Sequence, residues 1–462
     1  MDYERRARRQ SLRIIISEAI MVLTVIIMVI VLALVVSGYW INSNLEVERQ
    51  GMLQMNSIPT GANIQIDGEE LRFQRTNSSK ILTSGEHEVK LYRDGYDTWT
   101  KTVDIREGLL YRLNYPHLFL QEREKEDVYD ATGTTFATIS SNRNLILLAN
   151  KTTKWVLLNL ESTTIKPVTV DISNAFSSVS LAPGATSGLF NGEIISAKWD
   201  NANEHVLFKA KTAKGDIEWV LISVRNPARN INITREFATV FDEINIFDNS
   251  ASNLLAIRNG NLHKINVESR QISALLARDI TSYNYMDNEI IYSTANNIYT
   301  YRLGDDEPTL LEGLEAPAKV LLSRFYDTKY ITTINGTSIT VYNKDDLEEV
   351  GSATLSFLPA KSKIGHDGDF VFMQNGNNFA VFDMESLSVI EWSPDSKNYG
   401  WITNYMMYAV KDGELIVYDF DGLNRRSIST NVSERFPVTI TNDRMMYYFS
   451  DDQLIREWLI KR

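Results

Sequence analysis

The chain has 462 residues, of which 44% are hydrophobic and 23% charged, and its formal net charge is −12. This length and apolar content predict two or three globular domains and argue against a disordered chain. The chain has no cysteine, which excludes disulfides, thiolate metal sites and a cysteine nucleophile. The acidic balance argues against nucleic acid as a partner, because such a chain repels phosphate.

An N-terminal apolar segment predicts a membrane anchor. Residues 19–36 are apolar except for Thr24, and this run is long enough to cross a hydrocarbon core of about 30 Å. Tyr39 and Trp40 follow, where an aromatic belt would lie. A cleaved signal peptide is the alternative, but its apolar region is shorter, and Val35-Val36-Ser37 is a poor cleavage site.

The charges around this segment predict its orientation. Five arginines precede it, and Glu46 and Glu48 follow it, which favours a cytoplasmic N-terminus. We therefore expect a basic cytoplasmic tail over residues 1–13 and one transmembrane helix over residues 14–41. The lipid bilayer is then a partner through this helix, and all later residues lie outside the membrane.

Short strands and turns follow over residues 51–118. Pro59 and Gly61 make a turn ahead of the alternating strand NIQI, and Asp67-Gly68 and Asp94-Gly95 are hairpin-type turns. The stretches PTGANIQIDG and LTSGEHEVKLYRDGYDTWTKTVDI together resemble a PEGA domain, a small β-sandwich of bacterial and archaeal surface proteins. The residues that fit the pattern are Pro59, Gly61, Ala62, Asp67, Gly68, Gly85, His87, Gly95, Tyr96 and Trp99.

The PEGA pattern has two departures in this chain. Thr60 replaces the glutamate, and Thr76-Asn77 stands where Thr-Pro is usual. Neither position belongs to the expected core, so the fold expectation is unaffected. The resemblance implies a non-catalytic module of a surface protein, often next to a membrane anchor, with no defined ligand.

Residues 119–462 contain a repeat of about forty residues, which is typical of a four-stranded propeller blade. Each unit has an Asp or Asn turn followed by an apolar strand and a further strand. Eight units predict eight blades, with seven blades as the alternative. The turn residues are Asn142, Asp200, Asp248, Asp287, Asp327, Asp367, Asn404 and Asn442.

The last unit ends after its third strand, so an earlier segment is needed to complete its sheet. We expect residues around Leu118–Tyr129 to supply this outer strand, because an unpaired edge promotes aggregation. The unit ending YDFDGLNRRSIS resembles blades of TolB-like and dipeptidyl-peptidase-type propellers, which implies the architecture only. The signature dipeptide of WD-like repeats is missing from the blade ends. The insertion between Ser173 and Asn191 is a candidate binding loop, with a plain spacer as the alternative.

No residue is assigned to catalysis, to a cofactor or to a metal. The five histidines are far apart in sequence: His87, His117, His205, His263 and His366. His87 is expected to pack or cap a turn at the start of a strand. The recurring Asp and Asn residues are expected to bond their own turns. The alternative is that they converge on one face of the ring and bind a cation or form a carboxylate pair.

The predicted fold class is all-β with one N-terminal transmembrane helix, a small β-sandwich and a β-propeller. The leading functional hypothesis is a non-catalytic, membrane-anchored binding or scaffolding protein of a prokaryotic envelope, whose propeller loops bind a protein or a glycan. The alternatives are an envelope glycan hydrolase or lyase with funnel carboxylates, and a passive tether between membrane and wall. The sequence predicts no oligomeric state.

Overall fold

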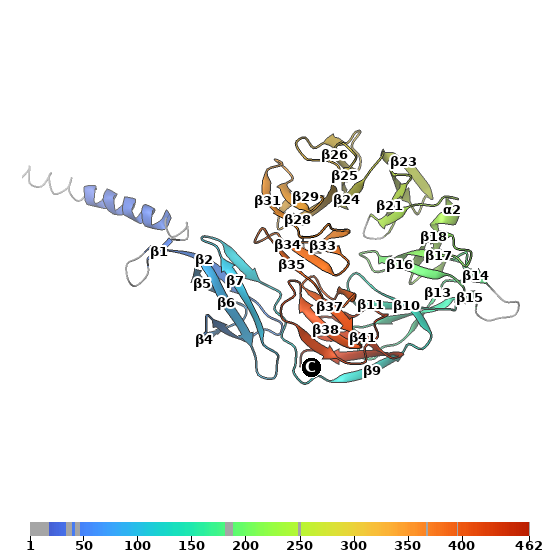
Figure 1. Cartoon of the computed structure of the whole chain (residues 1–462), viewed down its shortest axis with the longest axis horizontal. Coiled ribbons are helices and arrows are strands. Elements are labelled where there is room, and N and C mark those ends of the chain that lie inside the picture. Colours follow the sequence, from blue (N-terminus) through green and yellow to red (C-terminus); the bar gives the residue numbers. More distant parts are fainter. Residues whose placement is uncertain are drawn as a thin grey trace, which may run out of the picture. The chain divides into compact units, whose positions relative to one another are not determined.

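The structure is a computed structural model that describes residues 18–33, 39–41, 47–180, 188–247, 251–365, 368–394 and 396–461. The chain divides into two compact units, the first ending at Glu122 and the second spanning Arg123–Ile460. The elements of both units are drawn in Figure 1. Almost all of the regular structure is β-strand, as the sequence predicts.

A helix formed by residues 18–33 precedes the strands. It carries twelve large apolar side chains between Ile20 and Leu32, and each is at least 49% exposed. In the described part of the chain, no helix meets the length and hydropathy expected of a membrane span. The expected basic tail (residues 1–13) and residues 14–17 and 34–38 of the expected anchor lie outside the described residues.

The first unit contains two four-stranded sheets that share a core. In one sheet β1 (Tyr39–Ile41), β2 (Val47–Met55) and β5 (Ser78–Thr83) follow in that order, and β8 (Leu110–Leu113) pairs with β2 in parallel. The other has the order β4 (Glu69–Arg75), β3 (Asn63–Ile66), β6 (Gly85–Tyr92) and β7 (Trp99–Ile105). Ile64, Leu91 and Trp99 are completely buried, because alternate side chains of these strands face the core.

One turn in the first unit shows why its sequence pattern needs these residues. Asp67 and Gly68 both have positive φ, 51° and 84°, as a two-residue hairpin turn requires. The Asp67 carboxylate accepts a hydrogen bond from the Glu88 N–H at 2.9 Å and bonds the His87 ring at 2.6 Å. The turn is therefore fixed to the neighbouring strand β6.

The second unit contains eight four-stranded antiparallel sheets among its described residues. The first four are β10–β13 (Thr134–Ile139, Leu145–Asn150, Lys154–Asn159, Val168–Asp171), β16–β19 (Glu193–Trp199, His205–Lys211, Ile217–Ser223, Ile231–Asn232), β20–β23 (Glu243–Ile246, Asn253–Arg258, Asn261–Asn266, Gln271–Ala277) and β24–β27 (Ser282–Met286, Glu289–Ser293, Ile298–Arg302, Thr309–Leu310).

The remaining four sheets are β28–β31 (Lys319–Phe325, Thr328–Asn335, Ser338–Asn343, Glu349–Thr354), β32–β35 (Lys361–Ile364, Phe370–Asn375, Asn378–Asp383, Ser388–Trp392), β36–β39 (Asn398–Trp401, Met406–Lys411, Glu414–Asp419, Arg426–Ser429), and β40–β42 (Thr439–Thr441, Met445–Ser450, Gln453–Trp458) with β9 (Lys125–Asp130). We number these sheets as blades one to eight. The structure therefore has the eight predicted blades and not the alternative seven.

The blades are arranged as a ring because each one buries its apolar faces against its neighbours (Figure 1). The second strands are apolar and buried over most of their length, as in LILLAN of β11 and FVFMQN of β33. One apolar cluster joins blades eight and one through Tyr447, Phe449 and Leu148. First strands of neighbouring blades also contact each other, as β24 contacts β28, so these strands are the innermost ones.

Strand β9 completes the eighth blade, which confirms the predicted ring closure. It pairs with β42, from Lys125 opposite Glu457 to Asp130 opposite Gln453. The Glu457 side chain is fully buried and accepts hydrogen bonds from Arg123 Nε at 2.6 Å and from the Tyr448 hydroxyl at 2.7 Å. The first and last strands of the propeller are thus joined by their backbones, and the residue Arg123, just before β9, adds a buried ion pair to β42.

Short extra elements fill the two longer intervals of the repeat. The first interval contains the hairpin β14 (Val179–Ser180) and β15 (Leu189–Phe190), and its residues 181–187 lie outside the described residues. The second contains the 3-10 turn η1 (Pro227–Arg229) and α2 (Ile233–Glu236). Phe190 packs on Trp155 with ring centroids 5.7 Å apart, so β15 is anchored to blade one.

The buried ion pair at the ring closure predicts a large mutational effect. We expect Glu457→Ala to lower the free energy of unfolding by about 3–5 kcal/mol, because Arg123 and Tyr448 lose a buried carboxylate. Urea unfolding followed by tryptophan fluorescence measures this change. The exposed Glu161→Ala is the control, with an expected change within about 0.5 kcal/mol. Equal effects of the two substitutions would show that the closure does not depend on this ion pair.

Candidate functional site on the innermost strands

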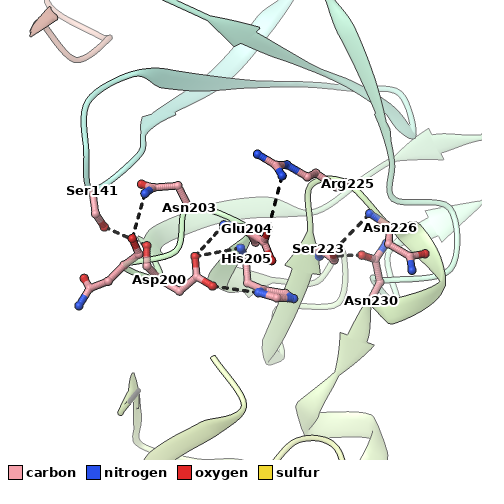
Figure 2. Close-up of polar contacts among 10 residues, drawn as sticks. Ser141, Asp200, Asn203, Glu204, His205, Ser223, Arg225, Asn226 and Asn230 are labelled. Atoms are coloured by element: carbon pink, nitrogen blue, oxygen red, sulfur yellow. Dashed lines mark hydrogen bonds and ion pairs between the residues drawn. The ribbon is translucent and has the colours of Figure 1, made fainter. Parts of the chain in front are cut away.

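The recurring Asp and Asn residues lie in the turns that follow the innermost strands. Figure 2 shows the Asp200 side chain turned toward the backbone of its own turn. Its Oδ1 accepts hydrogen bonds from the N–H groups of Glu204 at 2.8 Å and His205 at 3.0 Å, and its Oδ2 bonds the His205 ring at 2.9 Å. The carboxylate is therefore saturated by local bonds, which favours the expected turn role.

Other turns of the series use their polar residues in related ways. Asn142 accepts from the Asn144 N–H at 3.1 Å and from the Ser140 hydroxyl at 2.7 Å. Asp287 forms an ion pair with Arg324 of the next blade at 2.6 Å. In blade seven Thr403, two residues after the innermost strand, accepts the turn N–H groups. Asp248 and Asp367 lie outside the described residues.

The described histidines do not come together in one site. His87 bonds Asp67 and the Thr83 carbonyl, and His205 bonds Asp200. Burial disfavours the charged ring of His87, but these hydrogen bonds outweigh that cost and raise its pKa. His117 Nδ1 lies 2.9 Å from the Tyr115 carbonyl, His263 belongs to β22, and His366 is outside the described residues. Among the described side chains, no cluster of three His, Asp or Glu residues could hold a metal ion.

The innermost strands are basic although the whole chain is acidic. Their two carboxylates are Glu193 and Glu243, and their described basic residues are Lys198, Lys319, Arg324, Lys361 and Lys363. The sequence-based hypothesis did not identify these lysines. The sequence did contain an indication of their position, because each of the strands KSKI and EIISAKW precedes an Asp turn of the repeat series. Their common surface became visible only when the ring placed the first strands side by side.

Lys198 belongs to a polar network over blades two, three and four. Its ammonium donates to Asn245 Oδ1, and the Asn245 amide donates to Glu243 Oε1 at 2.6 Å and also contacts the Tyr283 hydroxyl. Burial lowers the pKa of Lys198 in spite of the negative charge of Glu243. These bonds connect three innermost strands, and they use Glu243 as an acceptor within the network.

Lys363 occupies the corresponding position in blade six. Each of these lysines is the penultimate residue of its strand, and the pairing of Lys198 with Leu207 matches that of Lys363 with Phe372. The Lys363 ammonium lies 5.0 Å from the Trp401 ring centroid, a cation–π distance. Burial lowers the pKa of Lys363 to about 8, although its side chain keeps contact with solvent.

An open groove of about 700 Å³ lies between blades six and seven, two residues along the same strands from Lys363 and Trp401. Its basic and aromatic wall is formed by Lys361, Lys397 and Tyr399. The hairpin of β33 and β34 also lines the groove, and its residues Gln374, Asn377 and Asn378 contribute amide groups. The groove can therefore present positive charge and amide hydrogen bonds to one ligand.

The lowered pKa of Lys363 predicts a reactive amine. Near pH 8 about half of this side chain should be neutral, whereas an ordinary lysine with a pKa of about 10.4 is almost fully charged. We expect acetic anhydride at pH 8 to modify Lys363 several times faster than the turn residue Lys214, as measured by peptide mass spectrometry. Similar rates for the two lysines would contradict the described environment of Lys363.

Sequence comparison confirms the PEGA resemblance. The family described as the PEGA domain matches residues 50–117. This match lies within the first unit and covers less than half of the chain. No curated protein matches the chain.

Solved structures similar to this chain include WD40-like β-propeller proteins. The alignment with a chain of the crystal structure of a mitotic checkpoint complex covers 76% of this chain and 99% of that chain, with 11% identity and a TM-score of 0.38. The alignment with Hsv2 from Kluyveromyces lactis covers 64% of this chain and 98% of the Hsv2 chain, with 10% identity and a TM-score of 0.41. The alignment with the computationally designed protein Ika8 covers 72% of this chain and 100% of the Ika8 chain, with 11% identity and a TM-score of 0.41.

Proposed function

We propose that this chain is a membrane-anchored, non-catalytic binding or scaffolding protein of a prokaryotic cell envelope. The PEGA domain and the β-propeller would lie outside the membrane, and the N-terminus would lie in the cytoplasm. The single observation that carries the anchor is the helix of residues 18–33, because its apolar side chains are exposed all around. A helix that is apolar on every side is suited to a lipid environment.

The binding role is supported by the architecture of the two units. PEGA domains and propellers of this kind are generally binding modules, and a ring of blades holds surface loops on a rigid frame. Glu243, one of two carboxylates on the described innermost strands, is held by Asn245 beside Lys198. This arrangement favours binding over the hydrolase or lyase alternative, which needs two available carboxyl groups.

The anchor can be tested by placing charge in the helix. The full-length chain is expected to stay with membranes during alkaline carbonate extraction and to be released by detergent. The double variant Ile27→Lys and Val31→Lys should move to the soluble fraction, because each lysine costs about 3 kcal/mol at the centre of a membrane helix. The matched control is Ile81→Lys with Leu109→Lys, two exposed sites in the first unit. Carbonate release of the unmodified chain would contradict the proposal.

The orientation needs a separate measurement. In cells stripped of their wall, an external protease should digest the PEGA domain and the propeller while a tag at the N-terminus stays protected. Protection of the propeller until the membrane is permeabilised would contradict an external location. Affinity capture with the full-length chain in detergent, using envelope extract, then identifies the retained protein or glycan.

A further inference from the structure

The groove between blades six and seven is preformed by bonds between the two blades. The Tyr399 hydroxyl of blade seven donates to the Gly376 carbonyl of blade six at 2.5 Å, and it accepts from the Gln374 amide. The Asn375 amide donates to the Leu358 carbonyl at 2.8 Å. The turn of residues 375–378 is therefore fixed in place before any ligand arrives, which lowers the entropic cost of binding.

The charge of this groove is uncompensated within the described residues. Lys361 and Lys397 line the groove, and Lys363 lies two residues beyond Lys361 on the same face of β32. None of these three ammonium groups has a carboxylate partner in the described parts of the chain. The strands β32 and β36, whose sequences are KSKI and NYGW, carry no acidic residue.

This local charge is opposite to that of the chain, whose net charge is −12. An acidic protein that keeps several lysines unpaired in one preformed groove favours an anionic ligand at that place. Charge-assisted hydrogen bonds from lysine to carboxylate or phosphate oxygens are stronger than neutral ones. The sign of the ligand follows from these lysines.

The other groups in the groove indicate a ligand rich in hydroxyls. An amide side chain both donates and accepts hydrogen bonds, and so does a hydroxyl group. Asn377 and Asn378 offer such amides, whereas the Gln374 amide already donates to the Tyr399 hydroxyl, and the Tyr399 ring adds a flat surface. Protein partners are usually anchored by large side chains in apolar pockets, whereas among the described residues that line this groove Ala360 is the one aliphatic side chain.

We propose that the groove between blades six and seven binds an acidic glycan, with Lys361 and Lys397 contacting its anionic groups and the amides contacting its hydroxyls. Lys363 and Trp401 extend the binding surface along the same two innermost strands. This inference rests on the proposed binding function and names the class of ligand for it. It does not depend on the membrane anchor.

The test measures binding of a fluorescent polygalacturonate oligomer to the full-length chain in detergent by anisotropy. The neutral comparison is the same oligomer with its carboxylates methyl-esterified. We expect the acidic form to bind at least tenfold more tightly and its affinity to fall with added salt. Equal affinity for the acid and the ester would overturn the proposal.

The matched variants locate the site. The double variant Lys361→Gln with Lys397→Gln should weaken binding at least tenfold, and the arginine pair at these positions should keep most of the affinity. The control Lys166→Gln with Lys214→Gln changes the net charge equally at exposed lysines of blades one and two, and its affinity should stay within twofold. Equal losses in the two glutamine variants would overturn the site, because they would indicate a non-specific charge effect. A matching unfolding midpoint for each variant shows that folding is intact.

Poly-L-glutamate of similar length separates the two kinds of acidic polymer. Binding of this polypeptide as tight as that of polygalacturonate would overturn the glycan assignment and indicate an acidic protein instead. If none of the anionic polymers binds, this inference is overturned. The membrane association and the external location of the chain are measured separately and would not be affected by that result.

Discussion

The structure of the second unit depends on one constraint, which is that each blade must be covered on both faces. A four-stranded sheet with apolar residues on both sides cannot stand alone in water, so it packs against a neighbour on each side. The arrangement is complete only when blade eight also packs against blade one, through Tyr447, Phe449 and Leu148. The pairing of β9 with β42 then gives blade eight the same four strands as the other blades.

Closing the ring also decides where charge collects. The first strand of every blade is brought toward a common axis, so residues far apart in sequence, such as Lys198 and Lys363, share one surface. Only two of the acidic residues that make the whole chain negative, Glu193 and Glu243, lie on the described innermost strands. The result is a locally basic interior wall within an acidic protein, and the proposed preference for an anionic ligand rests on this contrast.

Turn chemistry and spacing made the architecture predictable from sequence. Asp200 and Asn142 bond their own turns, whereas Asp287 pairs with Arg324 of the next blade. The recurring Asp and Asn residues mark the units of the repeat, although their bonds differ from blade to blade. The outer strand of blade eight was predictable because the last unit of the repeat has only three strands in the sequence. The candidate site was not predicted: the strand KSKI precedes a turn of the repeat, but the charge of Lys361 or Lys363 does not by itself reveal that the strand faces inward. In the same way, the link between Asp67 and His87 joins residues that only the sheet brings together.

The position of β9 has a consequence for how the propeller is made. This strand precedes every other propeller strand in the chain, yet its partner β42 is the last. During synthesis β9 therefore stays without its partner strand until the final hairpin, which contains β42, has left the ribosome. Contacts between segments so distant in sequence form slowly, because the intervening chain has to be ordered first. Ring closure should then be the last step of folding, which would make a prematurely terminated chain recognisable by its exposed edge.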